Sequence, residues 1–139
     1  MDLLTLLHPK LVHFPIAFFF GAWFLDVVSL LSKKEPVYKA AVYVYIMAAF
    51  SSAAAVASGL WEADRLNVHH PLMYTHRNFA FAVLGVSWTG LILIYILGKQ
   101  PQAARLVFTC ACWLAAALVL AASYFGGEMV FGYGVGVHL

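Results

Sequence analysis

The sequence predicts an all-α membrane protein, built as an up-down bundle of four transmembrane helices. Of its 139 residues, 64% are hydrophobic and only 10% are charged, whereas soluble domains are about 45–50% apolar and about 25% charged. The apolar residues gather in four runs, each close to the roughly 20 residues that cross a bilayer as a helix. Because the loops are short, consecutive helices are expected to lie antiparallel in a single domain covering residues 1–139.

The apolar runs place the expected spans at residues 14–31, 40–61, 78–97 and 104–124. Pro15 falls in the first turn of the first span, where a proline costs no hydrogen bond. Charged residues, glycine or proline follow the end of each span. After the last span comes Gly126-Gly127, and we expect residues 125–139 to form an irregular tail over one end of the bundle.

Basic residues predict which way the bundle faces. The two short loops and the residues beside them carry Lys33, Lys34, Lys39, Lys99 and Arg105, which is more positive charge than the opposite end carries. Loops rich in lysine and arginine stay in the cytoplasm. The expected location is therefore the bacterial inner membrane, with both termini on the outer, periplasmic side.

The histidines are all expected at that outer end. They are His8, His13, His69, His70, His76 and His138. Histidine is the commonest metal ligand at neutral pH. His13 and His76 begin the first and third spans, which are diagonal in an up-down bundle. We therefore expect these two imidazoles to hold a haem iron from opposite sides.

Small residues dominate the second and fourth spans at the same depth, in segments 51–59 and 115–123. Small residues let helices approach closely in lipid, and they equally leave a flat slot for a porphyrin. Ser58 and Gly59 are accordingly candidate cofactor contacts. Arg77 is a further candidate, because its charge can pair with haem propionates.

These residues predict a b-type cytochrome, an electron-transfer protein rather than an enzyme in its own right. It would hold one haem b, with a second at His8 and His69 or His70 as a weaker prediction. One haem at one end cannot carry electrons across a core of roughly 30 Å. The expected partners are therefore the lipid bilayer, a quinol, a periplasmic cytochrome or another redox subunit, and a second copy of the chain. The net charge of +2 does not indicate nucleic-acid binding.

Two other functions stay open. A non-haem zinc or copper site could draw on the histidines of the outer end, namely His8, His13, His69, His70 and His76. Alternatively, the chain is a structural membrane subunit without a cofactor. Asp26, the one carboxylate inside a predicted span, is a candidate for a proton or quinone role; alternatively, it reaches the membrane interface or bonds to Tyr43 or Ser29.

Three motifs resemble a known family. They are His8-Pro9-x-x-Val12-His13-Phe14-Pro15-Ile16-Ala17, the pair His76-Arg77, and the closing Gly126-Gly127-x-Met129-Val130-x-x-x-Gly134-Val135-Gly136-Val137. Together they are similar to a bacterial inner-membrane family, the domain-of-unknown-function family 2231, over essentially the whole chain. The resemblance implies a small four-span protein that works beside redox or cytochrome systems. The chain departs from the closing motif at Tyr133, where the family pattern has a histidine.

Overall fold

The computed structural model describes residues 7–67 and 69–134, and all regular structure within them is helical. The elements in chain order are α1 (Leu7–Leu11), α2 (His13–Ser32), α3 (Glu35–Arg65), α4 (Pro71–Ile96), α5 (Pro101–Gly127) and the π-helical turn η2 (Glu128–Gly132). They make four segments long and apolar enough to cross a membrane, α1 continuing into α2 and α5 into η2. The prediction of an all-helical membrane protein with four spans is confirmed.

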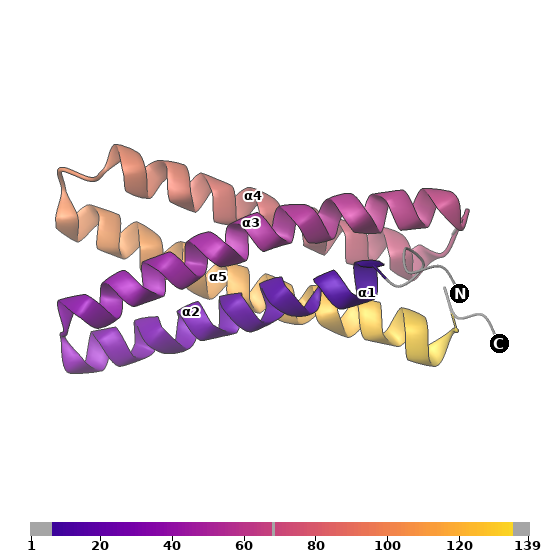
Figure 1. The fold of residues 1–139 in the computed structure, drawn as a ribbon, viewed down its shortest axis with the longest axis horizontal. Helices are drawn as coiled ribbons and strands as arrows, with labels where there is room; N and C mark the ends of the chain where they lie inside the picture. Colours follow the sequence, from indigo (N-terminus) through magenta and orange to yellow (C-terminus); the bar gives the residue numbers. More distant parts are fainter. Residues whose placement is uncertain (1–6, 68, 135–139) are drawn as a thin grey trace.

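The helices form two hairpins, α2–α3 and α4–α5, whose tight turns lie at the same end of the bundle (Figure 1). In the connection between α2 and α3, Lys33 ends α2 with a φ of 56°, and Pro36 is among the first two residues of α3. In the second turn Pro101 begins α5. Both prolines fit because the first residues of a helix need no N–H partner. We call this end, which carries Lys33, Lys34 and Lys99, the lysine end, and the opposite end the histidine end.

The two hairpins pack into one ring of four helices. Helix α2 contacts α3 and α5, and α4 contacts the same two helices, so that α2 and α4 are diagonal. Phe19, Tyr45 and Phe108 fill the middle of the bundle; all three are wholly buried, and the Tyr45 ring meets the other two edge to face at 5.7 and 5.6 Å. Such edge-to-face pairs stabilise a core beyond the apolar area that they bury.

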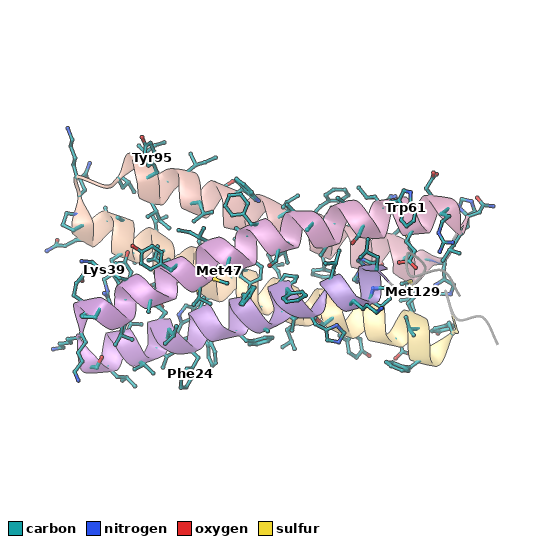
Figure 2. All side chains as sticks on the ribbon, in the orientation of Figure 1. Phe24, Lys39, Met47, Trp61, Tyr95 and Met129 are labelled. Atoms are coloured by element: carbon teal, nitrogen blue, oxygen red, sulfur yellow. The ribbon has the colours of Figure 1, made fainter. Side chains whose placement is uncertain are left out.

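The outside of the bundle is apolar. The side chains of Phe24 and Tyr95 point away from the helices (Figure 2) and are 60% and 88% exposed. Soluble proteins rarely expose large contiguous apolar surfaces, whereas lipid accepts them. The exposed aromatic residues therefore fit the assignment of the four segments as membrane spans.

Helices α4 and α5 approach each other closely at Gly90. A Cβ atom there would lie 2.7 Å from the Cβ of Ala111 and 3.0 Å from the Tyr45 hydroxyl oxygen. We expect Gly90→Ala to lower the free energy of unfolding by about 1–3 kcal/mol through overpacking, measured by thermal unfolding in detergent with circular dichroism. Gly85→Ala is the matched control on the same helix, because its Cβ would meet nothing within 4 Å. Equal destabilisation by both substitutions would contradict the close contact.

The helices reach beyond the predicted spans at the histidine end. Helix α3 continues to Arg65 rather than ending near residue 61, and α4 begins at Pro71 rather than near residue 78. Polar residues mark where a helix leaves the hydrocarbon core, but they do not end its hydrogen bonding. Apolar length therefore locates the part of each helix that contacts lipid, and it does not give the helix ends.

The expectation of an irregular tail over residues 125–139 is wrong for residues 125–132. Helix α5 continues to Gly127 and η2 follows to Gly132. Glycine disfavours a helix by only about 1 kcal/mol relative to alanine, and Gly126 packs against the ring of His76. Residues 135–139, with the candidate His138, lie outside the described residues.

Candidate functional site

Two imidazoles meet at the histidine end of the bundle. His8 lies on α1 and His76 on α4, with ring centroids 6.4 Å apart and ring planes at 77° to each other. His8, which the sequence suggested as a ligand of a second haem, is thus the histidine that lies beside His76. His13 lies one residue beyond the break between α1 and α2, where its side chain is exposed and its Nδ1 donates a hydrogen bond to the Pro9 carbonyl at 2.7 Å.

The His8 ring is held by α3, the other helix of its hairpin. Its Nδ1 lies 3.0 Å from the carbonyl oxygen of Ala55 and 3.2 Å from the hydroxyl of Ser58. The ring rests on Gly59, where a Cβ atom would come within 2.7 Å of the imidazole. The predicted cofactor contacts Ser58 and Gly59 therefore lie at the site, and both touch the His8 imidazole directly.

The His76 ring is held in the same way by α5. Its Nδ1 lies 2.8 Å from the carbonyl oxygen of Ala122, and a Cβ atom on Gly126 would lie 3.1 Å from the ring. In each hairpin the first helix supplies an imidazole, and the second supplies a carbonyl with a glycine four residues later. Residues four apart lie on the same face of a helix, so the alanine carbonyl binds the ring and the glycine, one turn later, leaves space for it.

These anchors determine which ring nitrogen carries the proton. A carbonyl oxygen only accepts hydrogen bonds, so Nδ1 of both His8 and His76 is the donor. In a neutral imidazole the lone pair is then on Nε2, and within the described residues neither Nε2 has a hydrogen-bond partner. A histidine that ligates a metal typically donates its other nitrogen to a carbonyl or carboxylate in this manner. Each hairpin thus contributes one imidazole whose Nδ1 is bound to a backbone carbonyl.

The remaining candidates lie away from this pair. The His69 ring is exposed and pairs through Nε2 with the Asn67 side-chain oxygen at 3.0 Å. His70 caps α4 by accepting a hydrogen bond from the Leu72 N–H, and its ring packs against Tyr133 at 5.0 Å. Arg77 places its guanidinium 5.1 Å from the Tyr74 ring centroid. The contacts of His69 and His70 are therefore with Asn67, Leu72 and Tyr133, and a second haem at His8 with His69 or His70 stays a prediction.

A repeated alanine-glycine spacing in the sequence could have pointed to His8, but the lengths of the apolar runs do not reveal it. Segments Ala55-Val56-Ala57-Ser58-Gly59 and Ala122-Ser123-Tyr124-Phe125-Gly126 share alanine and glycine four residues apart, and each accepts one ring. The first span was expected to begin at residue 14, which left His8 outside any helix. Once α1 extends the span by about one and a half turns, His8 rather than His13 reaches the depth of His76.

Fold and site define a class: a four-helix membrane-spanning protein in which each hairpin presents one carbonyl-anchored histidine to the other. The chain belongs to the family described as "Predicted membrane protein (DUF2231)", whose family model matches residues 5–139. No curated protein and no solved structure matches the chain.

Proposed function

We propose that this protein is a membrane-bound b-type cytochrome whose haem iron is ligated by His8 and His76. The observation that carries the proposal is the facing pair of imidazoles, each with Nδ1 bound to a backbone carbonyl and Nε2 free of protein hydrogen bonds in the described residues. Relative to the sequence expectation, His8 takes the place of His13 as the first ligand. His76 keeps its predicted role.

The spacing of the two rings fits ligation of one iron from both sides. Imidazole nitrogens bind metal ions at about 2.0–2.1 Å, so two histidines that would hold one metal ion must have their rings close together. The observed separation of the centroids is 6.4 Å. The two histidines come from different hairpins, so a flat macrocycle between the hairpins would receive one ligand from each.

The number of ligands favours haem over a non-haem metal. Structural zinc sites take four protein ligands and catalytic ones three, whereas haem, whose four porphyrin nitrogens already bind the iron, takes at most two. Within residues 7–67 and 69–134, no group of three or more histidine, cysteine or acidic side chains is placed to hold a metal ion. Zinc or copper is therefore the weaker alternative.

Haem b, when bound, supplies one-electron chemistry at its iron. The chain's contribution is to hold both imidazoles in one tautomer and to surround them with small, apolar helix surfaces, which tunes the potential. Lysine and arginine at the lysine end favour its placement in the cytoplasm, so the histidine end faces the periplasm of a bacterial inner membrane. Electrons would be exchanged there with a quinol, a periplasmic cytochrome or another redox subunit.

Absorption spectroscopy tests this function. The chain is expressed with haem available, purified in detergent, and its oxidised and reduced spectra are recorded together with iron and zinc analysis. We expect a reduced α-band of the bis-histidine b type and about one iron per chain for one such axial pair. A colourless protein that takes up no added haem would overturn the proposal, and bound zinc without porphyrin would favour the non-haem alternative.

A further inference from the structure

A buried carboxylate lies far from the histidine pair, toward the lysine end. Asp26 of α2 has no exposed surface, and it follows His8 by 18 residues, which is about 27 Å along a helix. Acidic residues inside membrane spans are costly and mark functional positions by default. The surroundings of Asp26 therefore need an explanation of their own.

Helix α5 provides the hydrogen-bond donors for this carboxylate. The indole N–H of Trp113 donates to Oδ2 at 3.0 Å, and the Thr109 hydroxyl donates to Oδ1 at 3.3 Å. Thr109 and Trp113 are four residues apart and therefore lie on the same face of the helix. The Ser29 hydroxyl on α2 donates to the backbone carbonyl of Asp26 at 2.8 Å and lies 3.5 Å from Oδ1. The expected partner Ser29 is thus present, whereas Tyr43 is 67% exposed on α3.

The Ser29 hydroxyl lies between the Arg105 guanidinium and the Asp26 carboxylate. Arg105 donates from Nη2 to the Ser29 hydroxyl at 2.8 Å and stacks over Tyr38 at 4.5 Å. The ion pairs of the described residues are Lys39–Glu35 and Arg65–Glu62, so Asp26 takes part in none of them. Arg105 lies in the first turns of α5, at the lysine end, and is partly exposed.

The Asp26 carboxyl group combines complete burial with hydrogen-bond donors from α5. Burial inside a membrane span removes water from the carboxyl group, and the Trp113 and Thr109 donors replace part of that hydration. Among the described residues, Tyr38 of α3 and Cys112 of α5 are titratable groups that interact with Asp26. Neither is an acid that could share a proton with a carboxylate near neutral pH.

We propose that Asp26 is a proton-binding site that exchanges its proton with water at the lysine end. The Ser29 hydroxyl lies between the carboxyl and the partly exposed Arg105, and a hydroxyl both donates and accepts hydrogen bonds. A proton from that side adds to a carboxylate oxygen, and the Thr109 hydroxyl turns from donor to acceptor toward the new O–H. No other group is oxidised, reduced or released. The site does not depend on haem at the histidine end.

Infrared difference spectroscopy on the full chain in liposomes tests the site. Lowering the pH should reveal a carbonyl band of a protonated carboxylic acid, which Asp26→Asn removes. Trp113→Phe should shift that band, because the carboxyl group loses a hydrogen-bond donor. With the chain inserted in one orientation, a pH change applied on the lysine side alone should produce the band.

Trp113→Phe keeps the experiment decisive if Asp26→Asn fails to fold. Absence of any acid band that Trp113→Phe shifts, or a band that follows the pH of the histidine side, would overturn the proposal. Leu114→Phe is the matched control on the same helix: residue 114 is 51% exposed and makes no bond to the carboxylate, so the band should be unchanged.

Discussion

Replacing His8 with alanine is expected to abolish the haem spectrum, and replacing His13 is expected to leave it intact. The His8 imidazole faces His76 at 6.4 Å between ring centroids, whereas the His13 ring is exposed and bound to the Pro9 carbonyl. Loss of a residue that only supports a ligand weakens metal binding by about 10–100-fold, so loss of the ligand itself should exceed that. Haem titration of the purified variants, followed by absorbance, measures the change.

His13→Ala is a matched control because the same side chain is removed five residues away. His76→Ala should behave like His8→Ala, since each hairpin supplies one ring. If His13→Ala lost the spectrum while His8→Ala kept it, the ligand pair would be the one that apolar length predicts. If neither His8→Ala nor His76→Ala changed it, haem would not lie between these rings.

Adding a single methyl group at Gly59 is expected to weaken haem binding by about 10–100-fold, less than the loss of His8 itself. A Cβ atom there would lie 2.7 Å from Cε1 of His8, so the imidazole must move away from the Ala55 carbonyl that holds it. The anchoring bond is of the kind whose loss costs about 10–100-fold in metal affinity. The same titration measures the effect, and circular dichroism establishes that the helices are retained.

The neighbouring glycines of α5 give a graded control for this effect. Gly126→Ala should weaken haem binding less than Gly59→Ala, because the added Cβ would lie 3.1 Å from the His76 ring. Gly127→Ala should leave binding unchanged, since its Cβ would meet nothing within 4 Å, and alanine slightly favours the helix. An equal loss in all three variants would show that helix flexibility, and not the space beside the rings, is what haem binding needs.

The hydrogen-bond partners of a buried polar residue were harder to predict from the sequence than the membrane spans. Asp26 was expected to bond to Ser29 or Tyr43, which lie on the same hairpin, yet its two strongest donors, Thr109 and Trp113, come from α5. A carboxylate inside lipid needs donors wherever it faces. Which helix it faces depends on the rotation of α2 in the bundle, and this rotation has little signature in a span that is apolar almost all round.

The sequence alone predicted four helices long and apolar enough to cross a membrane, and it separates the histidines from the lysine-bearing loops. Each follows from local composition, because hydrocarbon requires about 20 apolar residues per helix whatever the helix packs against. Only the tertiary structure decided that His8 rather than His13 meets His76, and that Gly59 and Gly126 make room for these rings. Ring placement depends on the break after α1 and on contacts 46 or more residues apart in the chain, which exist only once the helices are packed.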